Sequence, residues 1–429
     1  MSFLLFCFVL FLALGMPIAF VIGIAGMVYF IVTPVLPPEI VVQQIVSQSQ
    51  SFAFLAVPFF IFAGNLMNVS GITRRLLDLA RLLTRRMYGG TAQISVVMST
   101  LMGGVSGSAT ADAAMETRIL APEMMRLGYG KGYICAINCI TALITATIPP
   151  SLGLIIFGFV GEVSIGRLFA AGIIPGILMM LFLMSTTTIT SRIKKYDPPR
   201  PEAAKLTLKE LANNLRDSIW ALLFPVILIV GIRFGLFTAS ESGAFAVVYA
   251  IIIGKFVYKE LSWEKFKQAL VTSFKDNGAI MLIIAMSGPF SYAITWVQLP
   301  VTLSNFIFGI TDNPYLLTLI ILGFLFISGM FVDSNVNFLL LTPIFLPMVI
   351  KVGMDPVHFG VLMATMVTLG VMTPPIGSAL YTVCGIIDCP PEEYAWASLP
   401  FMGAVFAELA LLVFLPDLIL WIPNMIFGK

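Results

Sequence analysis

Residues 101–117 read LMGGVSGSATADAAMET, and this stretch constrains the fold of the whole chain. Glycines, hydroxyl side chains and two acids, Asp112 and Glu116, interrupt an otherwise apolar segment. Only the twelve residues from Thr91 to Met102 precede the Gly-Gly pair. As a helix they would extend about 18 Å, which is too short to cross roughly 30 Å of hydrocarbon. The pattern predicts a re-entrant hairpin that turns at mid-depth and returns over residues 113–127.

The composition is that of a membrane protein. The chain has 429 residues, of which 59% are hydrophobic and 11% are charged, whereas soluble domains are about half apolar and about a quarter charged. We therefore predict an all-α polytopic membrane protein in a lipid bilayer, and the net charge of +2 does not indicate a nucleic-acid partner. The apolar runs include residues 3–33, 52–69, 133–160, 168–190, 219–234, 239–257 and 280–296.

The distribution of Lys and Arg indicates the orientation. These residues cluster at 74–86, 192–216 and 255–275, whereas the connections 34–50 and 298–313 carry none. The positive-inside rule places the clusters in the cytoplasm. Counting the crossings between them predicts a cytoplasmic N-terminus and a periplasmic C-terminus. The first apolar run lacks a basic start and a cleavage site, so we expect it to remain as a membrane helix.

Residues 71–88 have the pattern of an amphipathic helix that lies along the membrane surface. Apolar residues recur there at helical spacing, and arginines occupy the other face. An ordinary basic loop is the alternative, but the periodicity favours a cytoplasmic surface arm.

An internal repeat relates the two halves of the chain with an offset of 225 residues. Six Gly and Pro matches keep this register across about seventy residues. The basic segment 71–88 projects onto 296–313, which carries no Lys or Arg. The halves are therefore predicted to be inverted across the membrane, as in many secondary transporters. The matched pairs are Gly104 and Gly329, Pro122 and Pro347, Gly128 and Gly353, Pro149 and Pro374, Pro150 and Pro375, and Pro175 and Pro400.

The second half repeats the hairpin from the opposite face. Residues 316–328 lead to GMFVDSNVN at 329–337, and residues 338–350 lead out again. Both hairpins are followed by paired prolines, in TATIPPSLG at 145–153 and in VMTPPIGS at 371–378. Each proline removes a backbone donor and disfavours helix before it, so each break leaves free carbonyl groups near a hairpin tip.

The tips and the proline breaks offer oxygen ligands at the membrane centre. Non-helical backbone at that depth is tolerated only where protein or a wet cavity satisfies it. Bare carbonyls suit a dehydrated sodium ion, and the N-terminal ends of the returning half-helices suit an anionic substrate. We predict one sodium site beside each hairpin and no transition metal. The side chains expected to add oxygens are Ser106, Ser108, Asp333, Asn335 and Asn337.

Simpler interpretations exist for these features. A Gly-Ser stretch is also typical of a close helix crossing, but two tips from opposite faces, each followed by a proline pair at the same distance, favour a site. The buried acids Asp112, Glu116 and Asp333 are functional candidates because charge is costly in a bilayer. Glu116 is also close enough in sequence to Arg118 for a structural ion pair.

The remaining reactive residues do not form a catalytic pattern. The five cysteines lie in or beside apolar segments without disulfide or metal spacing, and we interpret them as packing residues. The one histidine, His358, has no matching ligands, and no G-x-x-x-x-G-K-[ST] phosphate loop is present. We therefore do not expect an enzyme. A membrane-embedded enzyme and a channel remain the alternatives from other classes.

Taken together, the motifs resemble the large membrane subunit of tripartite ATP-independent periplasmic (TRAP) transporters, over nearly the whole chain. The segment METR at 115–118 departs from the smaller residues of many relatives, which leaves the role of Glu116 open. The resemblance rests on LGMPIAF at 14–20, PFFIFAGNLMNVSGI at 58–72, GGVSGSATADAA at 103–114, IPPS at 148–151, GIIPG at 172–176, TASESGAFAVVYA at 238–250 and TPPIGS at 373–378.

The resemblance implies sodium-driven uptake of an organic acid across the bacterial inner membrane by an elevator mechanism. Two or more sodium ions would be the coupling ions, without an organic cofactor. The implied partners are a soluble periplasmic substrate-binding protein and a small four-helix membrane subunit. The motifs are most similar to those of the sialic-acid group, so N-acetylneuraminate is the expected cargo, with C4-dicarboxylates as the alternative.

The resemblance also implies a division into domains. Residues 91–192 and 314–429 would form the two halves of a moving transport domain, each with one hairpin. Residues 1–90, with the cytoplasmic arm, and 218–313, with a periplasmic arm, would form a fixed scaffold. A cytoplasmic basic linker would span residues 193–217.

The same resemblance implies three ligand sets at the hairpin tips and proline breaks. The first sodium ion would be held by Ser106, Ser108 and Thr147. The second sodium ion would be held by Asp333, Asn337, Met372 and Thr373. The substrate would contact Asp112, Ser108, Asn335 and Asp333.

Overall fold

All regular secondary structure in the part of the chain that the structure describes is helical. The computed structural model describes residues 2–33, 37, 39–50, 52–198, 207–311 and 313–428, and no strand occurs within these ranges. By length and composition, seven described helices could each cross a membrane, and up to nine spans result if each of two bent helix pairs counts as one. The predicted all-α polytopic membrane fold is confirmed.

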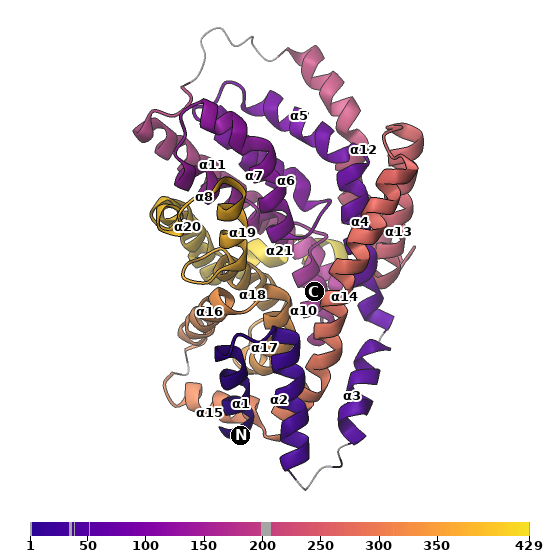
Figure 1. Cartoon of the computed structure of the whole chain (residues 1–429), viewed down its shortest axis with the longest axis vertical. Helices are drawn as coiled ribbons and strands as arrows, with labels where there is room; N and C mark the ends of the chain where they lie inside the picture. The colour runs from indigo at the N-terminus through magenta and orange to yellow at the C-terminus, as the bar shows by residue number, and fades with distance from the viewer. Residues whose placement is uncertain are drawn as a thin grey trace.

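The helices follow one another with short connections (Figure 1). The first half of the chain contains α1 (Ser2–Ala13), α2 (Ile18–Val32), α3 (Glu39–Ser49), the 3₁₀ turn η1 (Phe52–Leu55), α4 (Ala56–Val69), α5 (Ile72–Thr84), α6 (Gly90–Gly103), α7 (Ala109–Arg126), α8 (Lys131–Thr141), α9 (Leu143–Thr147), α10 (Leu152–Val160) and α11 (Ile165–Lys194). The second half contains α12 (Leu208–Arg233), α13 (Ala239–Ile252), the π-helical turn η2 (Ile253–Val257), α14 (Trp263–Trp296), α15 (Leu299–Phe308), α16 (Pro314–Phe331), α17 (Ser334–Lys351), α18 (Pro356–Val371), α19 (Ser378–Ile387), α20 (Pro391–Phe414) and α21 (Pro416–Phe427).

The two halves fold as matched copies. Helices α7 and α17 have the same length, and their boundaries lie 225 positions apart at both ends. The pairs α5 and α15, α6 and α16, and α11 and α20 correspond in the same register. In Figure 1, α6 and α7 lie in the upper part of the molecule, whereas α16 and α17 lie in the lower part. The predicted inverted repeat is confirmed.

Both predicted hairpins double back at their tips. The first one breaks between Gly103 and Ala109, and the second one breaks between Phe331 and Ser334. In the second hairpin, the Ser328 hydroxyl of α16 donates to the Asn337 amide oxygen of α17 at 2.5 Å. In the first hairpin, the Ser95 hydroxyl of α6 donates to the Glu116 carboxylate of α7, so in both hairpins the chain turns back far enough for the two half-helices to touch. Neither segment is one continuous helix.

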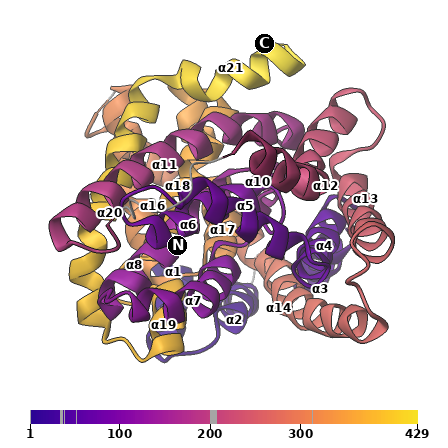
Figure 2. The same cartoon turned by 90° about the horizontal axis from the view of Figure 1, so that it is seen from above.

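The helices form two groups that lie beside each other. Figure 2 shows α3, α4, α13 and α14 on one side, and α8, α16, α19 and α20 on the other. Within the first group α4 packs against α13 and α14, and within the second α8 packs against α19 and α20. Helix α14, with 34 residues, is the longest described helix. The division into scaffold and transport parts that the resemblance implies stays a prediction.

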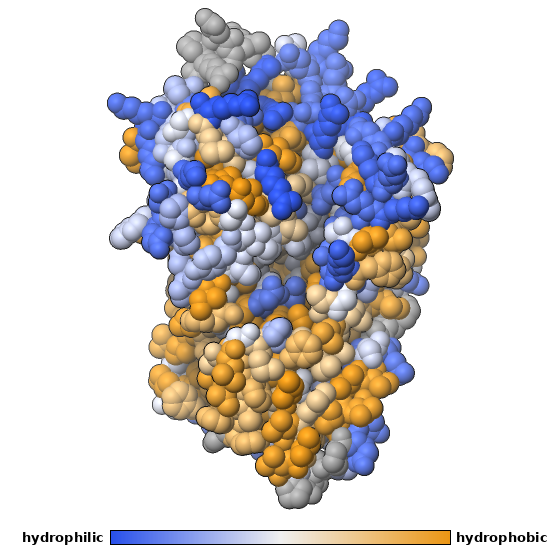
Figure 3. Space-filling view, viewed as in Figure 1, coloured by the Kyte–Doolittle hydropathy of each residue, from blue (hydrophilic) through white to orange (hydrophobic). Residues whose placement is uncertain are grey.

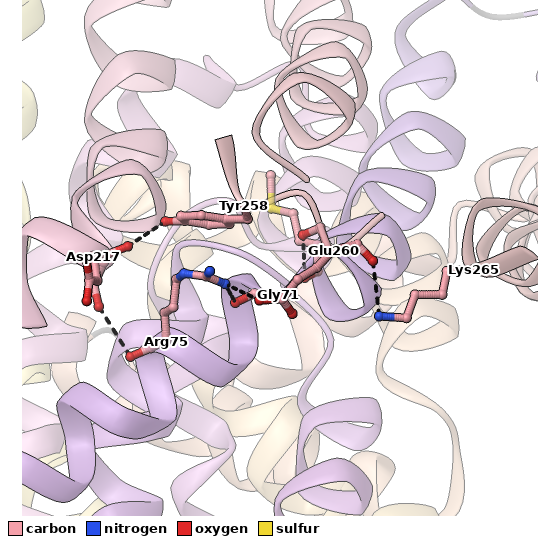
Figure 4. A network of polar contacts seen from close by, with 9 residues as sticks. Gly71, Arg75, Asp217, Tyr258, Glu260 and Lys265 are labelled. Atoms are coloured by element: carbon pink, nitrogen blue, oxygen red, sulfur yellow. Dashed lines mark hydrogen bonds and ion pairs between the residues drawn. The ribbon is translucent and has the colours of Figure 1, made fainter. Parts of the chain in front are cut away.

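The surface arm forms as the amphipathic pattern predicts. Helix α5 bends away from α4 by 64°, buries Ile72, Leu76 and Leu79, and leaves Arg74 exposed. A polar network joins the start of α5 to α12 and to the connection before α14 (Figure 4). The Arg75 guanidinium donates to the Gly71 carbonyl, pairs with Glu260 and lies 3.7 Å from the centre of the Tyr258 ring. In addition, the Tyr258 hydroxyl donates to the Asp217 carbonyl, and the Lys265 ammonium donates to the Glu260 carbonyl.

Hydrophilic residues concentrate at the end of the molecule that holds α5 and the start of α12 (Figure 3). Apolar residues cover most of the opposite half on the same face. This contrast fits a membrane protein whose basic segments lie together at one surface, as the distribution of Lys and Arg predicts.

Two expectations from the sequence need correction. The first apolar run does not form one helix, because the chain breaks at residues 14–17 and α1 and α2 pack against each other. The N-terminus lies at the end opposite α5 (Figure 1). The prediction of a cytoplasmic N-terminus counted the first apolar run as one membrane crossing, and that count no longer holds. The side on which each terminus lies therefore stays a prediction. The predicted linker 193–217 is also too long, because α11 continues to Lys194 and α12 begins at Leu208.

Candidate substrate and ion site

The tips of the two hairpins meet around one cavity. Its volume is about 150 Å³, and its walls come from the starts of α7 and α17, from the segment after the first proline pair and from α18. Three of the four predicted substrate residues, Ser108, Asp333 and Asn335, line it together. The fourth, Asp112, is not in the lining. The other polar lining residues are Thr110, Ser151, Ser334 and Thr368.

Two helices begin at this cavity. Helix α7 begins with Ala109 and α17 begins with Ser334, and both residues line the cavity. Each helix N-terminus carries about half a positive charge and unpaired N–H groups, so the cavity favours an anion. Small-molecule pockets are usually roughly 300–1,000 Å³. In this conformation the cavity can hold the carboxylate end of an organic acid rather than the whole of a large one.

The first tip is held against the first proline break. Gly107 has a φ of 68°, a left-handed conformation that glycine adopts without strain. A Cβ atom at Gly107 would lie 2.5 Å from the Pro150 carbonyl oxygen. The Leu152 N–H group donates to the Gly107 carbonyl at 3.5 Å. The tip and the segment after the proline pair therefore form one close-packed unit.

Asp112 is the most exceptional polar residue beside this tip. It lies in the first turn of α7, its side chain is 0% exposed, and neither carboxylate oxygen has a hydrogen-bond partner among the described residues. The hydroxyls of Ser106 and Thr145 interact with the carboxylate, but outside hydrogen-bond geometry. Burying an unpaired carboxylate is costly unless a cation or a donor compensates it. The arrangement suits a cation beside hairpin 1.

The second hairpin uses the equivalent position differently. Asn337 lies 225 positions after Asp112. Its amide oxygen accepts from Ser328, and its amide nitrogen donates to the Val332 carbonyl at 2.9 Å. Asn337 therefore cross-links hairpin 2, whereas the Asp112 oxygens make no hydrogen bond to the described residues.

Asp333 has a structural role as well as a place in the cavity. It is the N-cap residue of α17, and its carboxylate accepts from the Asn335 N–H group at 2.9 Å. In the first half, Ser108 is the N-cap of α7 but makes no side-chain cap bond. The Ser108 hydroxyl is therefore available to a ligand, while one Asp333 oxygen is engaged by its own helix.

The other predicted sodium ligands already have partners within the protein. The Thr147 hydroxyl donates to the Leu143 carbonyl, and the Thr373 hydroxyl donates to the Leu369 carbonyl. The Met372 carbonyl accepts from the Tyr394 hydroxyl at 2.6 Å. The Thr145 hydroxyl, which is not in the predicted set but interacts with Asp112, likewise donates to a carbonyl, that of Ser99 at 3.2 Å. Two residues along a helix differ by about 200° in direction, so only one of these threonines can face Asp112.

Glu116 is part of the framework of hairpin 1. Its carboxylate accepts from the Ser95 hydroxyl at 2.7 Å and from the Ser99 hydroxyl at 2.8 Å. Ser95 also shares a hydrogen bond of 2.7 Å with Thr141. The ion pair of Glu116 with Arg118 that the sequence allowed does not form. Glu116 joins α6 to α7, as Asn337 joins α16 to α17.

The histidine is structural. The ring Nε2 atom of His358 lies 3.0 Å from the Leu412 carbonyl oxygen, and the residue is 3% exposed. It joins the start of α18 to the end of α20 and is not among the residues that line the cavity.

Known proteins similar to this chain are transporter subunits. Over 407 residues, the chain is 35% identical to a putative TRAP transporter large permease protein of Haemophilus influenzae, with 95% of each protein covered. It is 33% identical to a sialic acid TRAP transporter large permease protein of Vibrio cholerae, with 96% of each covered. It is also 33% identical to an isethionate TRAP transporter permease protein of Oleidesulfovibrio alaskensis, covering 95% of this chain and 64% of that one.

The fold is similar to that of a solved transporter. The YdaH transporter of Alcanivorax borkumensis, described as having an unusual topology, aligns with a TM-score of 0.59 and 13% identity over 88% of this chain and 87% of that one. The family model of the tripartite ATP-independent periplasmic transporter DctM component matches residues 5–418. A match over almost the whole length, on a membrane fold with paired hairpins, identifies a transport protein and not an enzyme. The chain belongs to the family of DctM components, the large permease subunits of TRAP transporters.

Proposed function

We propose that the chain is the ion-coupled subunit that carries an organic acid into the cell with sodium ions. The observation that supports this most directly is the central cavity, in which two helix N-termini meet beside a buried, unpaired carboxylate. The helix N-termini favour the substrate anion, and Asp112 favours a cation. Sodium beside Asp112 would offset the charge of both carboxylates, so each ligand helps the other to bind.

The proposed first sodium site differs slightly from the set that the resemblance implies. Asp112, Ser106 and Thr145 interact around one point beside the first tip. Hard cations prefer oxygen ligands, and these three side chains supply them. We therefore place Asp112 with the cation and leave substrate contacts to Ser108 and Asn335, because a carboxylate would repel an anionic substrate.

An elevator movement is the mechanism that the two helix groups support. The cavity belongs to the group that contains both hairpins, and the scaffold helix α4 meets it at Gly64, where an added Cβ would lie 3.3 Å from the Ser106 carbonyl. A glycine at this point lets the two backbones approach without a side chain between them. The hairpin group can then slide as one body and expose the cavity to either side.

Two partners are proposed with the transporter. A periplasmic binding protein would deliver the organic acid; the family description, of a tripartite periplasmic transporter, supports a further component of this kind. A small four-helix membrane subunit would pack beside the scaffold. The Oleidesulfovibrio alaskensis relative is named DctMQ, and this chain covers 64% of its length. The remaining part of that relative is large enough to supply such a subunit.

N-acetylneuraminate is the proposed cargo. The alignment with a relative named for sialic acid transport covers 96% of this chain. Relatives named for sialic acid and for isethionate have the same identity to this chain, 33%. Overall similarity therefore does not separate the substrates, and the choice needs a transport assay that includes C4-dicarboxylates.

Reconstitution tests the function directly. Proteoliposomes that contain the chain and the small subunit, supplied with the binding protein, are expected to accumulate radiolabelled sialic acid only under an inward sodium gradient. Driving force is available, because each net charge that crosses gains about 2.3 kcal/mol per 100 mV. Equal uptake in potassium or choline buffer would remove sodium coupling. Uptake of a C4-dicarboxylate but not sialic acid would keep the coupling and change the cargo.

The Asp333→Ala variant tests the second hairpin. The change removes a carboxylate from the cavity and the cap of α17, and loss of an N-cap costs about 1 kcal/mol. We expect a reduced sodium response together with a lower melting temperature. Asp333→Ser keeps a capping oxygen but not the charge, and it separates the two effects. If both variants show the sodium activation curve of the original protein, Asp333 does not contribute to ion binding.

A further inference from the structure

Three cysteines from the two halves of the chain converge near the start of α8. Cys135 lies on α8, Cys384 lies near the end of α19, and Cys389 follows that helix. Their three sulfur atoms all lie within 4.8 Å of one another. The residues are buried, with exposed fractions of 0%, 3% and 6%. Because Cys135 is far from the other two in sequence, spacing along the chain did not reveal the cluster.

The turn after α19 produces this convergence. Asp388 has a φ of 49°, and the Cys389 N–H group donates to the Cys384 carbonyl at 3.0 Å. The chain therefore reverses and returns the Cys389 sulfur to the Cys384 sulfur. The Lys131 ammonium donates to the Asp388 carbonyl at 3.1 Å, which holds the turn against the first residue of α8.

The thiols have only weak partners within the protein. The Cys135 sulfur lies 3.8 Å from the Val383 carbonyl oxygen, and the Cys389 sulfur lies 3.5 Å from the Pro390 carbonyl oxygen. An S–H group is a weak donor, so little hydrogen bonding would be lost if the sulfurs bound an ion. Packing alone requires apolar volume but does not require three sulfur atoms from separate segments to lie within 4.8 Å of one another.

The donor set matches a soft metal ion. Metal–thiolate bonds are about 2.3 Å long, so three sulfurs around one ion lie about 4 Å apart. Thiolates select Cu(I) and zinc among the first-row metals. Zinc in structural sites is almost always four-coordinate, and no fourth Cys, His, Asp or Glu joins this group among the described residues. Three sulfurs without a fourth ligand therefore favour Cu(I).

We propose that Cys135, Cys384 and Cys389 form a binding site for one Cu(I) ion. Binding forms three copper–sulfur bonds, releases the thiol protons to solvent and leaves the oxidation state of copper unchanged. The Lys131 ammonium, which donates to the Asp388 carbonyl next to Cys389, would offset part of the negative charge of the thiolates. The ion would tie the α19–α20 connection to α8. This revises the prediction that the chain binds no transition metal and that all five cysteines only pack.

A chelator competition tests the site. Purified full-length protein, kept anaerobic in detergent, is titrated with Cu(I) in the presence of bathocuproine disulfonate, whose copper complex is coloured. We expect the protein to withhold one Cu(I) per chain from the chelator and to show a higher melting temperature with copper than without it. The Cys384→Ser, Cys389→Ser double variant is expected to withhold none.

Two further variants make the result specific. Cys7→Ser replaces a buried cysteine of α1 outside the group, and it is expected to bind one Cu(I) like the original protein. Cys135→Ser removes the ligand from the other half of the chain and is expected to lose binding while the metal-free melting temperature stays close to normal. Loss of all copper to the chelator by the original protein would overturn the proposal, as would full binding by the double variant.

Discussion

Replacing Asp112 with Asn is expected to nearly abolish sodium-driven uptake. The substitution keeps the shape of the side chain but removes the carboxylate beside hairpin 1, which has no hydrogen-bond partner among the described residues. A hydrogen bond to a charged group contributes about 1.5–3 kcal/mol, and a contribution of that size corresponds to about 10- to 150-fold in affinity. The sodium concentration that gives half-maximal uptake in proteoliposomes should rise by that factor.

Glu116→Gln is the matched control for this variant. It removes a buried charge from the same helix one turn later, but Glu116 is hydrogen-bonded to two serines that join α6 and α7. We expect a lower melting temperature and a sodium half-saturation close to that of the original protein. An equal sodium shift in both variants would mean that any buried charge on α7 affects coupling, and Asp112 would lose its assigned role.

The second large effect is expected from Gly107→Ala. A left-handed conformation costs a non-glycine residue about 1 kcal/mol, and the new Cβ atom would also lie 2.5 Å from the Pro150 carbonyl oxygen. Because this carbonyl belongs to the proline break, the tip has to move away from it. We expect uptake to be lost while the protein still inserts into the membrane, measured as initial uptake rate per amount of purified protein.

The Gly128→Ala variant separates the effect of backbone strain from the effect of the steric conflict with the proline break. Gly128 has a φ of 81°, but no heavy atom lies within 4 Å of an added Cβ. The backbone strain is therefore similar, while the steric conflict with the proline break is missing. This variant should melt at a slightly lower temperature and transport at a near-normal rate. If both alanine variants transport equally well, the close contact between tip and break is not required.

The hairpins and the repeat could be predicted because their signals are local. Polar tips, proline pairs and the length of each apolar run are visible in short windows of sequence, and the register of 225 residues follows from matched Gly and Pro positions. The break between α1 and α2 also has a local signal, in Gly15 and Pro17. It was missed because the surrounding run of apolar residues is long enough for one crossing.

The details of the site depend on the directions in which the side chains point, and the sequence alone does not show these directions. Asp333 and Asp112 are both acids near a tip, but only the structure shows that one caps α17 while the other stays unpaired. Thr145 and Thr147 are both close to the prolines, and their helix decides which one faces Asp112. The cysteine cluster joins α8 to the end of α19, and no pattern within either segment indicates the other.

The duplicated halves differ at one position that has consequences for the order of transport. Asp112 is an acid without a hydrogen bond, whereas its counterpart Asn337 is a neutral amide that is already engaged. Two cation sites that descend from one template would therefore differ in strength. On the proposed mechanism, the first ion loads beside Asp112 at low sodium concentration, and the second loads only when the substrate arrives. Release on the cytoplasmic side should then follow the reverse sequence.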